Sequence, residues 1–187
     1  MRALGAVLIT SMLIFAAACS NQADPSDDPS PIDEVPAAVT DGHVRFLVPQ
    51  DWHETAVDSD DWSVEGWSQK WHADPAEPEA GILLVNGNYG EDGAAMAIAR
   101  LVSDTYFGAF PGFIPDGEEW IEPEVEGGSR VRLVDFHYEN EINGTGKGVI
   151  WAIEDADFNT GVVMMRGTEI DADLITEIRD SIEFVDS

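Results

Sequence analysis

The residues best suited to ligand binding in this chain are aromatic and gather in two short segments. One of them, the Trp cluster, lies beside several aspartates and comprises Trp52, Trp62, Trp67 and Trp71. Indole faces stack on sugar rings and on apolar ligands, and neighbouring carboxylates accept hydrogen bonds from hydroxyl groups. The second segment is rich in Gly and Pro and contains Phe110 and Phe113. Packing inside the core is the favoured interpretation of these aromatics, and the six residues are the candidates if the chain has a ligand or partner surface.

No motif indicates catalysis. Residues 127–131 (GGSRV) lack the closing glycine of a G-x-S-x-G nucleophile motif. Glutamates gather over 118–126, where paired carboxylates could perform acid–base chemistry. Close carboxylates also arise by chance in so acidic a chain, and a domain of this size rarely holds the deep cleft of a glycosidase. We therefore expect no catalytic site, with a hydrolytic enzyme as the less favoured alternative.

Metal binding is not indicated either. The chain has four histidines: His43, His53, His72 and His137. They show neither the H-x-x-x-H nor the H-E-x-x-H spacing of zinc sites, and we expect them at exposed strand edges. Asp155 begins a segment like a calcium-binding EF-hand loop, but Thr160 stands where glycine is required and Arg166 where a bidentate glutamate is required. A hairpin turn explains this segment better. We expect no metal and no cofactor.

Residues 1–19 have the features of a secretory signal. Arg2 is followed by an uncharged apolar run of about 16 residues, which is short for a bilayer span of ~20 residues. The run ends in three alanines directly before Cys19, the single cysteine of the chain. This arrangement resembles the lipobox of bacterial lipoproteins, so we expect Cys19 to be lipidated. The alternatives are an ordinary signal peptide or an uncleaved anchor. One cysteine also excludes a disulfide within the chain.

The chain is strongly acidic, with 37 Asp and Glu against nine Lys and Arg and a formal net charge of −28. This charge repels phosphate backbones and excludes nucleic acid as a partner. Residues 20–41 are rich in Pro, Asp and Ser and predict a disordered acidic tether. Residues 42–187 carry 31 acidic and eight basic residues, or −23, and are expected to form one domain. Salt adaptation and solubility both explain this acidity.

The first half of the chain predicts strands, turns and one helix. The expected elements are a strand over 43–48, a turn over 49–52, a strand over 67–71, a buried central strand over 81–85, a helix over 92–107 and a loop over 107–117. Trp67 and Trp71 should share one face of their strand, and Asp92 should cap the helix.

The second half predicts hairpins and a closing helix. The expected elements are strands over 130–139, 147–153 and 162–166, turns over 143–144 and 155–161, and a helix over 171–182. Asp171 should cap this helix, whose apolar face carries Leu174, Ile175, Ile178 and Ile182. Together the elements predict an α+β fold: an antiparallel β-sheet with a meander in the C-terminal half, flanked by two main helices in an α/β/α sandwich.

Three stretches carry a resemblance to a known family. They are the strand and Pro-x-x-Trp turn over 46–52, the hairpins over 130–166, and the terminal helix running into 180–184. In these stretches the chain resembles the PsbP/Mog-type α/β/α sandwich family and, within it, the LpqN-type lipoproteins of actinobacteria. Asp51 departs from the glycine that usually precedes the tryptophan. The resemblance implies a binding or scaffold role in membrane-associated assemblies and offers no catalytic residue to carry over.

These observations predict a cell-envelope lipoprotein with a non-enzymatic binding or scaffold domain displayed outside the membrane. Its expected partners are the membrane, through a lipid on Cys19, and an envelope protein or a small ligand. The domain itself is expected to be monomeric. The alternative is a carbohydrate or cell-wall binding module that uses the Trp cluster.

Overall fold

The computed structural model describes residues 37–58, 66–104, 112–122, 129–141 and 144–185, all within the unit Glu34–Ser187. The strands in these segments are β1 Ala37–Asp41, β2 Val44–Val48, β3 His53–Thr55, β4 Gln69–His72, β5 Ile82–Gly90, β6 Phe113–Ile121, β7 Arg130–Asn140, β8 Gly144–Glu154, β9 Thr160–Gly167 and β10 Glu183–Phe184. The helices are α1 Ala94–Asp104 and α2 Ala172–Ser181.

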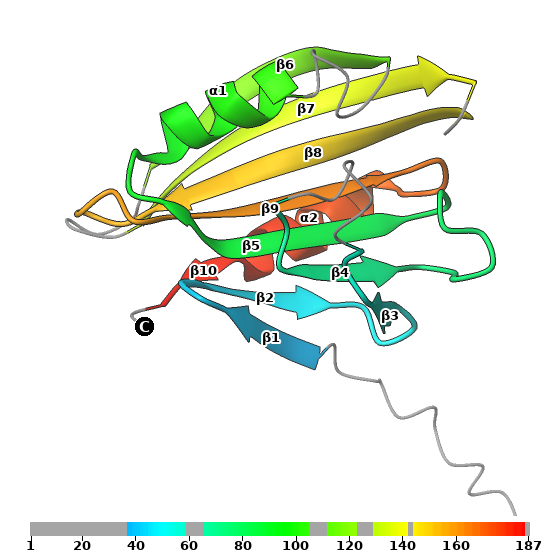
Figure 1. The fold of residues 1–187 in the computed structure, drawn as a ribbon, viewed down its shortest axis with the longest axis horizontal. Coiled ribbons are helices and arrows are strands. Elements are labelled where there is room, and N and C mark those ends of the chain that lie inside the picture. The colour runs from blue at the N-terminus through cyan, green and yellow to red at the C-terminus, as the bar shows by residue number, and fades with distance from the viewer. Residues whose placement is uncertain (1–36, 59–65, 105–111, 123–128, 142–143, 186–187) are drawn as a thin grey trace, which may run out of the picture. The chain divides into compact units, whose positions relative to one another are not determined.

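The strands form two antiparallel sheets. The larger has seven strands in the order β3-β4-β5-β9-β8-β7-β6, which Figure 1 shows from β4 to β6. The smaller has three strands in the order β1-β2-β10. With one helix between β5 and β6 and another after β9, the predicted α+β class is confirmed.

The larger sheet has two apolar faces, because successive side chains along its strands point to opposite sides and both sides carry apolar residues. In β8, Val149 and Trp151 belong to one buried cluster, core 1, whereas Ile150 and Ala152 belong to another, core 2. Successive strand residues point to opposite faces, so the two cores lie on opposite sides of the sheet. Core 1 includes Ile178 of α2, and core 2 includes the buried residues of α1. Each helix therefore covers one face, and α2 lies behind β9 in Figure 1.

The central part of the sheet follows the sequence pattern. The apolar run expected as a central strand forms the first half of β5, between β4 and β9, with Leu83, Leu84 and Val85 fully buried. The turn expected over 49–52, between β2 and β3, also forms, since the Trp52 N–H donates to the Pro49 carbonyl over 3.0 Å. Burial on both faces explains why this strand is apolar throughout rather than alternating.

Helix α2 forms where its apolar stripe and its cap predict. The Asp171 Oδ1 atom accepts a hydrogen bond of 2.7 Å from the Leu174 N–H, which satisfies one of the free donors of the first turn. Leu174, Ile175, Ile178 and Ile182 all pack into core 1. The amphipathic pattern therefore fixed both the position of this helix and the face that it buries.

Helix α1 begins later than expected, and the prediction that Asp92 caps it is wrong. Asp92 forms an ion pair with Arg100, and Gly93, with φ of +82°, turns the chain into the helix. The Ala94 N–H donates instead to Glu154 Oε2 over 2.6 Å, a carboxylate from the end of β8. This negative charge at the helix N-terminus complements the helix dipole. Residues 105–107 of the expected helix lie outside the described segments.

Two further boundaries differ from the prediction. Ala37–Asp41, assigned from its composition to the tether, forms β1 and pairs with β2, with Val39 packed against core 1. Residues 37–41 therefore belong to the folded domain, because pairing with β2 satisfies the backbone of this segment. Phe113–Ile121 forms β6, although residues 113–117 were expected in a loop, and Phe113 is buried against Phe136.

Candidate functional site

A groove between α1 and β6 is the candidate site. Helix α1 packs mainly on β7, β8 and β9, so the edge strand β6 extends past it. The pairing of β6 with β7 shifts register between Pro115 and Gly117, which bends the edge strand. Gly117 has no side chain to fill the space created there. The helix and the bent edge strand are thus the two walls of the groove, and β7 is its floor.

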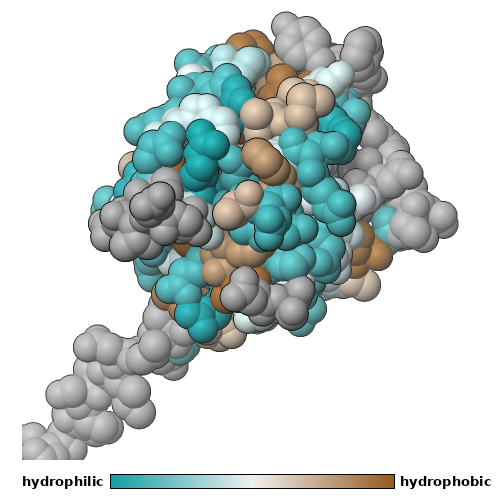
Figure 2. All heavy atoms as spheres, turned by 90° about the vertical axis from the view of Figure 1, so that its left-hand side faces the viewer, coloured by the Kyte–Doolittle hydropathy of each residue, from teal (hydrophilic) through white to brown (hydrophobic). Residues whose placement is uncertain are grey.

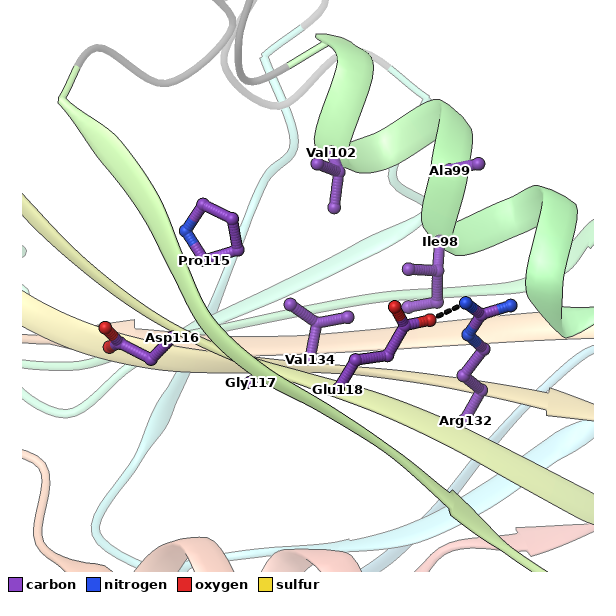
Figure 3. A pocket seen from close by; sticks show the side chains of 9 residues that line it. All are labelled: Ile98, Ala99, Val102, Pro115, Asp116, Gly117, Glu118, Arg132 and Val134. Atoms are coloured by element: carbon purple, nitrogen blue, oxygen red, sulfur yellow. Dashed lines mark ion pairs between the residues drawn. The ribbon is translucent and has the colours of Figure 1, made fainter.

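The groove has a volume of about 390 Å³ and a largely apolar lining. Its lining residues are Ile98, Ala99, Val102, Pro115, Asp116, Gly117, Glu118, Arg132 and Val134. Figure 3 shows Ile98 and Val102 pointing from α1 toward Pro115 and Val134. The groove stays open because α1 and β6 are both packed against core 2, α1 through Ile98 and β6 through Phe113. This volume is within the range of small-molecule sites, ~300–1,000 Å³.

The polar groups of the groove lie at its edges. Glu118 and Arg132 form an ion pair at one end, drawn as a dashed line in Figure 3. The Asp116 carboxylate points away from α1 and lies 2.6 Å from His137 Nδ1. The lining therefore offers a ligand one charged pair beside an apolar floor. Among the described residues that line it, none is a serine, cysteine, lysine or histidine.

Trp120 supports the charged end of the groove. Its ring lies under two guanidinium groups, at 4.5 Å from Cζ of Arg130 and 5.2 Å from Cζ of Arg132. Arg130 also pairs with Glu122, just after β6, at 3.4 Å and with Glu154 of β8 at 3.0 Å, and Arg132 pairs with Glu118 of β6. Cation–π contacts and ion pairs hold the Arg132 side chain in place at the groove.

The reasoning from sequence missed this arrangement, although a signal for it was present. Glu118, Trp120 and Glu122 alternate along one strand, and Arg130 and Arg132 alternate along the next. Opposite charges at matched spacing on neighbouring strands are the pattern of a cross-strand ladder. The loop expected over 107–117 covers the start of this strand, and a loop predicts no strand pairing.

The opposite face of β6 and β7 is acidic. Asp116 and His137 lie on this face. Asp135 also lies on it, because it follows Val134 of the groove floor and successive strand residues point to opposite faces. Burial, together with the charges of Asp116 and Glu119, raises the pKa of Asp135 above its usual value. Within the described residues, no group of three or more His, Cys, Asp or Glu side chains could hold a metal ion.

The aromatic residues predicted as a contact surface are not brought together on one. Trp52 and Trp71 are buried in core 1, and Phe113 is buried in core 2. These three residues pack in the core, as the core-packing interpretation of the aromatics predicts. Burial of the indole and phenyl rings stabilises the fold and leaves no face free for stacking on a sugar. Trp62, Phe110 and Cys19 lie outside the described residues.

The prediction that Trp67 and Trp71 share one face is wrong. Trp67 is half-buried against core 2, whereas Trp71 is in core 1, on the other side of the sheet. The strand β4 begins at Gln69, and before it the Ser68 N–H bonds to the Val85 carbonyl outside the ladder. The two-residue period therefore does not extend back to Trp67.

His43, His72 and Asp155 make contacts within the fold. His72 is buried rather than at an exposed edge, with Nδ1 3.2 Å from the Pro78 carbonyl oxygen, because the loop before β5 folds over it. His43 stacks on Phe184 at 5.1 Å between ring centroids. Asp155 is in a turn, as expected, where its Oδ1 accepts hydrogen bonds from two backbone N–H groups of that turn.

Comparison with known proteins adds no further assignment. No model of a known protein family matches the chain, and no curated protein matches it. Neither helix in the described part of the chain has the length and apolar character that crossing a bilayer requires.

Proposed function

We propose that this chain is a lipid-anchored cell-envelope protein whose domain binds a small ligand, without catalysing a reaction, in the groove between α1 and β6. The observation that carries the proposal is the groove itself, a space of about 390 Å³ with an apolar floor and the Glu118–Arg132 pair at its end. A single polar cluster beside apolar surface is the usual composition of a site that binds and orients a small molecule.

The lining also limits the chemistry of the ligand. Ile98, Val102 and Val134 favour an aliphatic or aromatic body. Glu118 balances Arg132, so this ion pair adds no net charge to the groove. With a net charge of −23 over residues 42–187, an anionic ligand is disfavoured. The ligand is therefore largely apolar and neutral or cationic, with a hydrogen-bonding group that faces the ion pair.

Titration with the neutral fluorescent probe N-phenyl-1-naphthylamine tests the proposal on the purified full chain. The variant Ala99→Phe extends a ring from an exposed helix position that lines the groove, and Ser103→Phe places the same ring on the exposed helix surface outside the lining. Wild type and Ser103→Phe should bind the probe with equal affinity. Ala99→Phe should bind at least about tenfold more weakly, because the ring occupies the ligand's place.

Two results would contradict the groove as a binding site. One is the absence of saturable probe binding by the wild-type chain. The other is equal binding by Ala99→Phe and Ser103→Phe, which would locate the probe elsewhere, for example on the apolar N-terminal residues. Equal urea midpoints for the two variants are the control that both proteins are folded.

The anchor is a separate part of the proposal. Cys19 follows a secretory apolar run, and a diacylglycerol on it would supply the two acyl chains that stable membrane attachment needs. The acidic domain is repelled by anionic lipid, so the lipid holds the chain at the membrane while the charge holds the domain away from it. Labelled palmitate should be incorporated by wild type and not by Cys19→Ser, and equal labelling of both would exclude lipidation at this residue.

We also propose the finer architecture: an α/β/α sandwich of the PsbP/Mog type, of the LpqN kind, with a C-terminal meander and a monomeric domain. The cores on opposite faces of the sheet, each covered by one helix, support the sandwich. The consecutive antiparallel pairing of β6, β7, β8 and β9 supports the meander. A solution mass of one chain at micromolar concentration tests the monomer.

A further inference from the structure

The turn between β8 and β9 contains a strained aromatic residue. Phe158 has φ of +66° and is the one non-glycine residue with positive φ in the described segments. The loop over 156–158 is closed by the Asp155 N–H bonding to the Asn159 carbonyl. In three-residue hairpin loops the last position adopts the left-handed conformation and usually carries glycine. A phenylalanine there is sterically disfavoured, because its Cβ atom crowds the following carbonyl.

The turn does not need the ring in order to form. Asp155 Oδ1 accepts hydrogen bonds of 2.9 Å from the N–H groups of both Asp157 and Asn159, and Oδ2 accepts one of 2.7 Å from Asn159 Nδ2. The Phe158 N–H donates to the Asp155 carbonyl over 3.2 Å. These bonds to Asp155 determine the backbone, and none of them involves the phenyl ring. The strain is therefore tolerated for a reason other than making the turn.

The ring is presented to solvent beside the start of α1. Phe158 is 54% exposed, and a Cβ atom placed on Gly93 would lie 3.2 Å from its Cδ1 atom. Met96, one helical turn from Gly93, is 49% exposed. Phe158, Gly93 and Met96 are called the Phe158 patch. The third large apolar side chain that is exposed in the described segments, Ile114, lies on β6 opposite His137, toward the other end of β8.

Acidic residues adjoin both parts of the patch along the chain, and Arg100, four residues after Met96, pairs with one of them, Asp92. Glu91 and Asp92 precede Gly93, and Asp155 and Asp157 precede Phe158 in the turn. The β8–β9 turn lies at the left of Figure 1, on the side that faces the viewer in Figure 2, where much of the surface is hydrophilic and apolar residues lie among it. An anionic membrane or a second acidic copy of the chain would be repelled by this rim. A basic surface would be attracted.

We propose that the Phe158 patch is a docking site for a basic protein surface, with the Phe158 ring inserted into an apolar pocket of that partner. Aromatic side chains that enter a pocket at the centre of an interface contribute a large share of its affinity. A strained backbone and an exposed ring are both unfavourable in the free domain, and binding compensates for them. The patch shares no residue with the groove, so this site stands apart from the proposed ligand site.

The test uses a synthetic amphipathic peptide of leucine and lysine, which presents an apolar face flanked by positive charge. Fluorescence anisotropy gives its Kd for the full chain and for two variants at ~150 mM salt. Phe158→Asn removes the ring and leaves a residue that tolerates positive φ. Ile114→Asn removes a side chain of similar exposure, 50%, far from the patch. Phe158→Asn should raise the Kd about fivefold or more, and Ile114→Asn should leave it within about twofold. Polylysine, which has no apolar face, should bind all three chains equally.

Three results would overturn the proposal. One is the same loss of peptide affinity in both variants, or none in either. Another is a lower urea midpoint for Phe158→Asn than for wild type, which would make the ring a structural support for α1; the proposal predicts an equal or higher midpoint. The third is weaker binding of Phe158→Asn than of wild type to anionic phosphatidylglycerol vesicles, which would make the patch a membrane contact. Equal vesicle binding by both is the expected result.

Discussion

Replacing Glu154 with glutamine should lower the free energy of unfolding by about 2 kcal/mol. The Glu154 side chain is 4% exposed and joins three elements, β8, β7 and α1. Its Oε2 accepts from the Ala94 N–H over 2.6 Å, and its Oε1 accepts from Arg130 Nη1 over 3.0 Å. Loss of a helix cap costs about 1 kcal/mol. Loss of the charge facing Arg130, whose side chain is 42% exposed, costs about 1 kcal/mol more.

Urea unfolding monitored by tryptophan fluorescence measures this change, since the midpoint and slope give the free energy directly. Glu122→Gln is the matched control, because Glu122 lies 3.4 Å from the same arginine but is 66% exposed. An exposed pair of this kind contributes about 0.5 kcal/mol or less. The reasoning is refuted if Glu154→Gln is within ~0.5 kcal/mol of wild type, or if both substitutions cost the same.

Three further predictions concern the core, the second helix and pH. Trp71→Ala should lower the free energy of unfolding by about 3–5 kcal/mol, because the indole is buried in core 1, and a loss below ~1 kcal/mol would show that it is not. Asp171→Ala should cost about 1 kcal/mol through the lost bond to the Leu174 N–H, and an unchanged urea midpoint would argue against that cap. Burial lowers the pKa of His72 from its usual 6.5, so the folded domain should lose stability as the pH falls through 6.5 toward the folded-state pKa. Urea titrations between about pH 5 and 7.5 should show this loss flattened in His72→Gln, and identical profiles would rule out His72 as its cause.

Local patterns predicted the elements whose partners are close in the sequence. The stripe on α2 and the Asp171 cap both involve residues within one helix, so periodicity and cap preference were sufficient. The strands β7, β8 and β9 follow one another in the sheet, so the hairpin turns and apolar runs that mark them lie close together in the sequence. The turn at Asp155 was predicted for the same reason, since its hydrogen bonds stay within five residues.

Features that depend on distant residues were not predictable in this way. The cap of α1 comes from Glu154, 60 residues further along the chain, and no local rule identifies it. Val39 belongs to a strand because it packs on core 1, although the composition of its segment resembles a tether. The groove needs α1 to cover the inner strands and leave β6 beyond it, which is a property of the tertiary packing alone. Trp67 and Trp71 diverge because the strand begins between them.

The location of a bound probe tests the central claim most directly. Methyl NMR spectra of the full chain, with labelled Ile and Val, can be recorded during addition of N-phenyl-1-naphthylamine. The account predicts saturable shifts for Ile98, Val102 and Val134, which line the groove, and none for Val163 and Ile178 in core 1. Shifts confined to residues outside the groove, with these three methyl groups unmoved at saturation, would contradict it.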